Sequence, residues 1–305
     1  MKQKLTLTVL VCTLLLSACG TSLDKNGLIE KYTNEHSKFI DVEGNRIHYR
    51  DEGKGDVIVL LHGTASSLHT WDHWAHQLTQ QYRVIRMDLP GFGLTGPDKQ
   101  DRYEVTDDVA FLNSFLAQLS IDRVHLVGSS LGGRIAWEYS LVNPDQVNSL
   151  TLINALGYPQ ESWPPAIEMA QWPVMDKVMT QVSPRFLYET GLKEVYFNED
   201  QVTDSVVDRY FELSRYPGNL DAFPKRVSAK LDNQSEKIAQ VSAPTLILWG
   251  QEDIYFPVAS AYRFHADVSQ SRLSVYANVG HLPMEEAPTR SVNDFLDFLD
   301  FIDVK

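Results

Sequence analysis

Cysteine is almost absent from this chain of 305 residues, which has two, Cys12 and Cys19, both near its start. So few cysteines leave no disulfide framework to stabilise the fold. Basic residues are also scarce, because 27 Lys and Arg stand against 40 Asp and Glu, a formal net charge of −13 at pH 7. That charge argues against nucleic acid as a partner and weighs against an anionic substrate.

Long apolar runs, internal repeats and low-complexity tracts are missing as well. The apolar run Leu5 to Leu16 is too short to span a bilayer as a stable helix, and it follows the basic start Met1-Lys2-Gln3-Lys4. These features predict a signal peptide at residues 1–18, with Cys12 in the removed part. An ordinary secretory signal with an incidental cysteine remains the alternative.

Leu16-Ser17-Ala18-Cys19 resembles the bacterial lipobox. The resemblance implies cleavage before Cys19 and acylation of its thiol by fatty acids such as palmitate, so that no free thiol remains. Two or more acyl chains would give a stable membrane anchor, and residues 19–37 would form the lipidated cysteine and a polar tether. We therefore expect a lipid-anchored protein of the bacterial cell envelope, at the outer membrane if the host is Gram-negative.

The rest of the chain alternates strand and helix patterns, and its 43% hydrophobic content is ample for a large core. Alternation of this kind predicts an α/β fold with a mostly parallel sheet covered on both faces. The expected strands are an opening hairpin (Phe39–Val42 and Arg46–Arg50), Val57–Leu61, Arg83–Met87, Arg123–Val127, Ser149–Ile153, Thr245–Trp249 and Leu273–Tyr276. The expected helices are Trp71–Gln80, Thr106–Leu119, Leu131–Val142, Val258–Ala266 and Thr289–Phe301.

Gly128-Ser129-Ser130-Leu131-Gly132 lies between one of these strands and the next helix. A G-x-S-x-G sequence at such a junction is typical of a nucleophile elbow, a strained turn that exposes a serine hydroxyl above a helix N-terminus. Only Ser130 has glycine two residues before it and two after it, which makes Ser130 the candidate nucleophile.

A serine nucleophile needs a histidine base and an acid that orients the histidine. The strand ending at Trp249 leads into Gly250-Gln251-Glu252-Asp253, and the strand ending at Tyr276 is followed by Gly280-His281. Because parallel strands end at one edge of the sheet, His281 and a carboxylate from Glu252 or Asp253 are expected close to Ser130.

The strand Val57–Leu61 ends in His62-Gly63-Thr64-Ala65. Backbone N–H groups of Thr64 and of Leu131, the residue after the serine, are candidates for an oxyanion hole. We interpret His62 as a structural residue that holds this loop.

Five motifs in order resemble the α/β-hydrolase family: His62-Gly63, Asp88-Leu89-Pro90-Gly91-Phe92-Gly93, Gly128 to Gly133, Trp249 to Asp253, and Gly280-His281. The resemblance covers the chain from about residue 39 to its end and implies a sheet of eight strands. It also implies a triad of Ser130, Asp253 and His281, with Asp253 preferred over Glu252, and an acyl-enzyme mechanism. Serine at the elbow argues against the dehalogenases and epoxide hydrolases of this fold, which use aspartate there.

Between the strands Ser149–Ile153 and Thr245–Trp249 the alternation stops, and aromatic residues and methionines recur at helical spacing. The resemblance implies a helical lid at residues 156–241, inserted into a core domain of residues 38–155 and 242–305. Most of these apolar side chains are expected in the lid's own core, so none is assigned to the substrate.

His69, His73 and His76 could form a metal site on one helix face. No cysteine or matched carboxylate completes such a set, so we interpret them as a solvated flank. Asp88 is interpreted as a structural residue of its Pro-Gly loop. We expect no metal, no cofactor and no nucleic acid.

The leading hypothesis is a serine hydrolase of small or medium apolar carboxylic esters. A carbon–carbon bond hydrolase shares the fold and triad but tends to have an aromatic residue after the histidine, where Leu282 stands here. Such enzymes also have a lid arginine for an acidic product, a role open to Arg185 and Arg215. A lipase and a non-catalytic binding protein on the same fold complete the alternatives, and the oligomeric state stays open.

Overall fold

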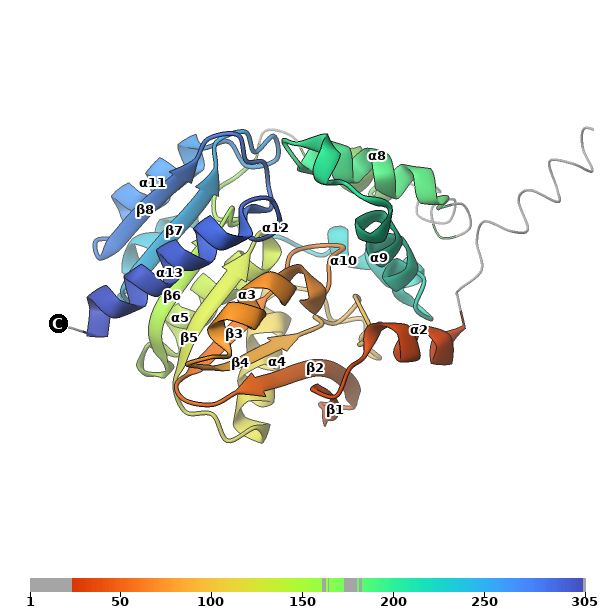
Figure 1. The fold of residues 1–305 in the computed structure, drawn as a ribbon, viewed down its shortest axis with the longest axis horizontal. Coiled ribbons are helices and arrows are strands. Elements are labelled where there is room, and N and C mark those ends of the chain that lie inside the picture. Colours follow the sequence, from red (N-terminus) through yellow and green to blue (C-terminus); the bar gives the residue numbers. More distant parts are fainter. Residues whose placement is uncertain (1–23, 161–162, 164, 173–179, 181–182, 304–305) are drawn as a thin grey trace, which may run out of the picture.

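The structure is a computed structural model that describes residues 24–160, 163, 165–172, 180 and 183–303 (Figure 1). Cys12 and Cys19, with the predicted signal peptide and lipidation site, lie outside the described residues. No helix among the described residues has both the length and the apolar character that crossing a bilayer requires.

Eight strands form one sheet in the order β1-β2-β4-β3-β5-β6-β7-β8, and this confirms the predicted α/β architecture. β1 and β2 are antiparallel to each other, β2 is antiparallel to β4, and the remaining neighbours are parallel. The strands are β1 (Ser37–Val42), β2 (Asn45–Gly53), β3 (Val57–Leu61), β4 (Arg83–Met87), β5 (Val124–Ser129), β6 (Val147–Ile153), β7 (Thr245–Gly250) and β8 (Ser271–Tyr276).

Helices cover both faces of this sheet (Figure 1). The period-2 alternation of β3 shows the two layers, because Val59 and Leu61 pack into one core cluster while Ile58 and Leu60 pack into the other. One face carries α4 (Val105–Gln118), α5 (Leu131–Val142) and α11 (Ala259–Asp267), and the other carries α3 (Asp72–Leu78) and α13 (Pro288–Asp303).

A helical insert joins β6 to β7 and lies beyond the ends of the strands (Figure 1). Its described elements are α6 (Pro165–Ala170), α8 (Arg185–Val195), η3 (Glu199–Gln201), α9 (Asp204–Ser214), α10 (Asn219–Val227) and η4 (Ser235–Gln240). Three short elements complete the core: η1 (Leu68–Trp71), η2 (Pro144–Gln146) and α12 (Pro283–Glu286).

The predicted polar tether contains a helix, α2 (Lys25–Tyr32), that packs on the insert. The side chain of Asp24 caps it by accepting the N–H of Gly27 at 2.7 Å. Lys31 Nζ lies 2.7 Å from Glu212 Oε2, and the Tyr32 hydroxyl donates to the same oxygen at 2.8 Å. The expectation of a simple tether therefore misses α2, whose Tyr32 is buried.

A buried ion pair fixes the insert to the core. Arg226 of α10 donates to both carboxylate oxygens of Asp108 in α4, at 3.0 and 2.7 Å, and its guanidinium lies over the rings of Phe92 and Tyr103. Burial raises the pKa of Asp108 to about 6, and the charge of Arg226 offsets part of that effect.

Replacing Arg226 with Met should lower the free energy of unfolding by about 3–5 kcal/mol, because Asp108 is then buried without its counter-ion. The double variant Asp108→Leu with Arg226→Met should recover most of that loss. Urea unfolding of the three proteins measures both effects, and a single variant as stable as the wild type would contradict this role of the pair.

Candidate active site

Ser130 occupies a sharp turn between β5 and α5. Its backbone has φ 54° and ψ −116°, the strained conformation expected of a nucleophile elbow. A Cβ atom at Gly128 would lie 2.1 Å from the Gly132 carbonyl oxygen, and one at Gly132 would lie 2.3 Å from the Leu61 carbonyl oxygen. Only glycine fits at these two positions, so the turn needs both of the residues that flank Ser130.

The loop after β3 lies directly against this serine. A Cβ atom at Gly63 would be 2.9 Å from Ser130 Cβ and 3.5 Å from Ser130 Oγ, so the backbone here approaches the hydroxyl closely. Among the hydrogen bonds of the described residues, the N–H groups of Thr64 and Leu131 donate to no acceptor. One N–H on this loop and one directly after the serine are therefore open to a further acceptor.

His62 holds the base of this loop. Its Nε2 accepts the N–H of Leu89 at 3.0 Å, so Nδ1 carries the proton and donates to the Gly63 carbonyl oxygen at 2.7 Å. Burial lowers the pKa of His62 to about 4, which keeps the ring neutral.

Asp253 and His281 come from the loops after β7 and β8 and are in direct contact. His281 Nδ1 lies 2.8 Å from Asp253 Oδ2. The other oxygen of Asp253 accepts the N–H groups of Tyr255 at 2.8 Å and Phe256 at 3.1 Å. The rings of Tyr255 and Phe256 also meet the imidazole edge-on, with centroids 5.4 and 5.3 Å away. The carboxylate and both rings therefore restrict the orientation of His281.

Glu252, the competing carboxylate, points elsewhere. Its Oε2 accepts the N–H of Val279 at 3.1 Å, and so it supports the turn that precedes His281. No hydrogen bond among the described residues joins Ser130 Oγ to His281. The structure thus joins Asp253 to His281 and brings the backbone of Gly63, the residue before Thr64, against Ser130. The Ser130–His281 contact and the oxyanion role of Thr64 and Leu131 stay predictions.

Asn154, which we did not expect from the sequence, holds the acid in place. Its Nδ2 donates to Asp253 Oδ2 at 2.5 Å, and its Oδ1 accepts the N–H of Gly250 at 3.1 Å. Asn154 is fully buried directly after β6, between the nucleophile strand and the acid strand. Its position directly after the strand Ser149–Ile153 could have indicated that Asn154 lies at the same sheet edge as the acid. No sequence motif, however, marks an asparagine as the partner of a carboxylate.

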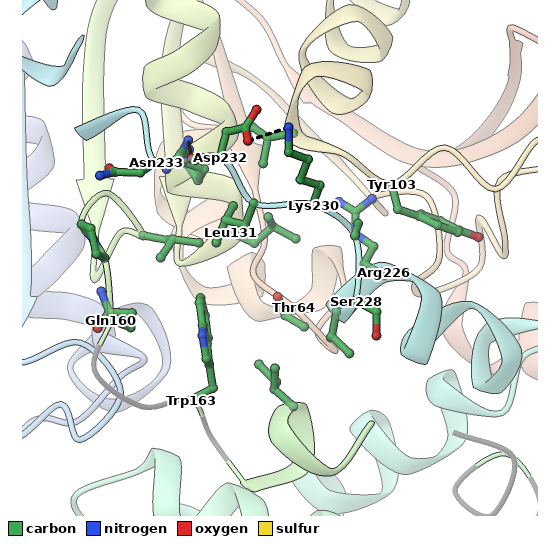
Figure 2. Close-up of a pocket in the computed structure, with 18 of the residues that line it drawn as sticks. Thr64, Tyr103, Leu131, Gln160, Trp163, Arg226, Ser228, Lys230, Asp232 and Asn233 are labelled. Atoms are coloured by element: carbon green, nitrogen blue, oxygen red, sulfur yellow. Dashed lines mark hydrogen bonds and ion pairs between the residues drawn. The ribbon is translucent and has the colours of Figure 1, made fainter. Parts of the chain in front are cut away.

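A cavity of about 570 Å³ opens beside Thr64 and Leu131 (Figure 2). Trp163 and Ile167 of the insert line it, as do Leu156 and Tyr158. The cationic side chains of this lining are already paired: Arg134 with Glu138, Arg226 with Asp108, and Lys230 with Asp232.

The three histidines near α3 do not share one solvated face. His69 is buried in η1, where its Nε2 lies 3.0 Å from the Tyr32 carbonyl oxygen and 3.1 Å from Arg50 Nη2. His73 and His76 are exposed on α3. The expectation of a solvated flank is therefore wrong for His69, because a 3₁₀ turn before the helix points it inward.

Asp88 lies inside the loop that follows β4. Its carboxylate accepts the N–H groups of Leu68 and Leu94, both at 2.8 Å, and contacts His48 Nδ1 at 2.7 Å. Burial acts to raise the pKa of Asp88, but the hydrogen bond and charge of His48 outweigh it and lower the pKa far below its usual value.

Replacing Asn154 with Ala should slow the reaction of Ser130 with a fluorophosphonate about tenfold, because the Asp253 carboxylate loses a donor and can rotate away from His281. The Gly250 N–H is also left unpaired, at a cost of about 1–3 kcal/mol in stability. Labelling rates with a fluorophosphonate probe and urea unfolding measure the two effects. Asn293→Ala, which removes only an exposed bond from Gln77, is the matched control. A wild-type labelling rate in Asn154→Ala would contradict the role of Asn154.

Comparison with known proteins finds relatives that are similar in sequence and in structure. A 2-hydroxy-6-oxo-2,4-heptadienoate hydrolase of Pseudomonas putida is 28% identical over 284 residues, which cover 86% of this chain and 96% of that protein. A meta-cleavage product hydrolase of Pseudomonas fluorescens superposes with a TM-score of 0.75 at 24% identity, over 86% of this chain and 97% of that one. A bacterial membrane phospholipase A superposes with a TM-score of 0.77 at 24% identity, over 99% of both chains.

The family model described as alpha/beta hydrolase fold matches residues 56–288. That span runs from the start of β3 to the beginning of α13 and includes the elbow, the acid, the histidine and the whole insert. The chain belongs to the α/β-hydrolase family.

Proposed function

We propose that this protein is a serine hydrolase that works through an acyl-enzyme. Ser130 Oγ attacks a carbonyl carbon while His281 Nε2 takes the hydroxyl proton, and Asp253 keeps the imidazole in the tautomer that can accept it. The N–H groups of Thr64 and Leu131 stabilise the oxyanion. His281 then gives its proton to the leaving group, and water, activated by the same imidazole, releases the acid and restores Ser130.

The hydrogen bond between Asp253 and His281 is the observation that carries this proposal. A carboxylate that takes two backbone N–H groups on one oxygen and the imidazole on the other has a defined orientation. An ordinary surface histidine would have neither such a partner nor two aromatic rings against it. This arrangement supports the role of a general base for His281.

For the bond that is cleaved, the cavity favours a carboxylic ester. Its wall combines apolar side chains with cations that already have carboxylate partners. A substrate with a neutral acyl group therefore fits this wall better than a substrate that carries a carboxylate of its own. The net charge of −13 acts in the same direction.

The curated relatives favour the second candidate, a carbon–carbon bond hydrolase, over the ester. The protein of Pseudomonas putida is named as a hydrolase of 2-hydroxy-6-oxo-2,4-heptadienoate, a compound that carries both a carboxylate and a ketone. In a carbon–carbon bond hydrolase the leaving group departs through a carbon atom, whereas in an ester hydrolase it departs through an oxygen atom. The carboxylate of such a substrate also needs a cationic side chain to bind it. Arg185 pairs with Asp204 and Asp208 at the surface, and Arg215 donates to the Ser183 carbonyl oxygen at 2.7 Å. Neither arginine lines the cavity among the residues that the structure describes.

Wild-type protein and Ser130→Ala should be compared on p-nitrophenyl butyrate, on 2-hydroxy-6-oxo-2,4-heptadienoate and on a fluorophosphonate probe. We expect the wild type to react with the probe and the ester, and Ser130→Ala to lose at least about a thousandfold in turnover. Turnover of the dienoate alone would establish the carbon–carbon reaction. Labelling without turnover would support a binding protein, and undiminished turnover in Ser130→Ala would refute the proposal.

We also propose that Cys19 carries a lipid anchor. The resemblance of residues 16–19 to a lipobox supports this, and α2 would then place the insert near the membrane surface, since it begins shortly after Cys19 and packs on α9. A lipase acting on membrane lipids would suit that placement.

Mass spectrometry of the protein purified from bacterial membranes should show an acylated N-terminal Cys19. Cys19→Ser should release the protein from the membrane fraction, because the thiol that receives the lipid is gone. An unmodified N-terminus at another residue would contradict the anchor and leave the hydrolase proposal unaffected.

A further inference from the structure

Glu285, four positions after His281, is the centre of a hydrogen-bond cluster outside the triad. Its carboxylate is largely buried, with 8% of the side chain exposed. It accepts four hydrogen bonds, from Arg209 Nη2 at 2.6 Å, Tyr196 OH at 2.5 Å, Tyr210 OH at 2.9 Å and Thr70 Oγ1 at 2.5 Å. A carboxylate this well satisfied fixes every group that points at it.

The four donors come from two different parts of the molecule. Thr70 belongs to η1, which continues the loop that begins at the proposed oxyanion-hole residue Thr64. Tyr196 follows α8, and Arg209 and Tyr210 lie in α9, so these three come from the insert. Glu285 itself belongs to α12, which follows His281. The insert, the oxyanion loop and the histidine loop thus meet at one side chain.

Two more contacts tie the insert to the oxyanion side of the site. Arg209 Nη1 donates to the carbonyl oxygen of His69 at 3.3 Å, and the Ser66 hydroxyl donates to the Tyr210 hydroxyl at 3.4 Å. His69, which accepts the first bond, and Ser66, which donates the second, both lie between Thr64 and α3. α9 therefore contacts the oxyanion loop as well as α12.

Backbone contacts place the histidine itself against the insert. The N–H of His281 donates to the Val195 carbonyl oxygen at 2.9 Å. Glu286, next to Glu285, accepts the N–H groups of Gly280 at 3.0 Å, Leu282 at 3.3 Å and Phe197 at 2.8 Å. The Glu286 carboxylate therefore binds the backbone on both sides of His281 and, through Phe197, the backbone of the insert.

The charge on Glu285 is stable in this setting. Burial alone would raise its pKa, but the charge of Arg209 and the hydrogen bonds of Thr70 and Tyr196 outweigh burial and leave the pKa below its usual value. The carboxylate thus keeps its full acceptor capacity near neutral pH.

We propose that Glu285 and Arg209 are positioning residues, which set the place of His281 relative to Ser130 and the oxyanion amides by joining α12, η1 and the insert. The inference rests on the proposed function, because it concerns the geometry of the same acyl-transfer site. It gives the insert a second role: besides covering the cavity, it aligns the base with the nucleophile. Misplacement of a base by about 1 Å can cost a hundredfold in rate.

The test compares fluorophosphonate labelling of Ser130 in the wild type, Glu285→Gln and Tyr196→Phe, at a temperature well below unfolding. Glu285→Gln removes the charge that Arg209 needs, and we expect labelling to slow about tenfold or more. Tyr196→Phe removes one hydroxyl from the cluster and should slow labelling about two- to fivefold. If the wild type turns over p-nitrophenyl butyrate, kcat should fall in both variants with KM little changed, because neither residue lines the cavity.

Lys31→Gln is the matched control, because it breaks the ion pair between α2 and Glu212 of the same helix α9 without touching α12. A purely structural role for the cluster would lower thermal stability in Glu285→Gln and Tyr196→Phe and leave the labelling rate of the folded protein at the wild-type and Lys31→Gln value. That result would overturn the inference, and Tyr196→Phe decides the matter if Glu285→Gln does not fold. Absence of Ser130-dependent labelling in the wild type would instead refute the proposed function.

Discussion

The parallel register of β3, β5, β6, β7 and β8 is the constraint on which the candidate site depends. Each strand carries its chain to the same edge of the sheet, so the loops that follow them bring together residues far apart in the sequence. Thr64, Ser130, Asn154, Asp253 and His281 each follow one of these five strands. The hydrogen bond between Asp253 and His281 spans adjacent strand ends, and Asn154 reaches Asp253 from the next strand along.

A sheet edge alone does not orient side chains, and the structure adds several fixed supports. The strained elbow places Ser130 between β5 and α5, and a neutral His62 braces the loop of Thr64, whose N–H has no acceptor among the described residues. Tyr255 and Phe256 hold the acid through their N–H groups and the imidazole through their rings. The insert adds the last support through Glu285 and Glu286, which connect it to the histidine loop.

Much of the core could be predicted from the sequence, because its signals are local. β3 (Val57–Leu61) and α5 (Leu131–Val142) match the expected ranges, since an unbroken apolar run and an amphipathic run after a G-x-S-x-G turn leave little choice. Contacts between distant segments have no such pattern. Nothing in the polar stretch before β1 indicates that α2 packs on α9, and nothing near His69 shows that Arg50 and the Tyr32 carbonyl oxygen enclose it.

The lack of a sequence pattern for contacts between distant segments also explains why sequence reasoning missed the supporting residues. Asn154 and Glu285 are ordinary polar residues beside the motifs, and only the fold shows that one meets Asp253 and the other meets Arg209. The cavity that we propose receives the substrate is lined largely by the insert, including residues 226–233. These residues carry none of the five family motifs.

The crystal structure of the protein after reaction with a fluorophosphonate tests the central claim most directly. The account predicts phosphorus bonded to Ser130 Oγ, its oxygen within hydrogen-bond distance of the Thr64 and Leu131 amides, and His281 Nε2 facing Ser130 Oγ with its bond to Asp253 intact. Phosphorus on another residue, or an adduct oxygen pointing away from both amides, would contradict it.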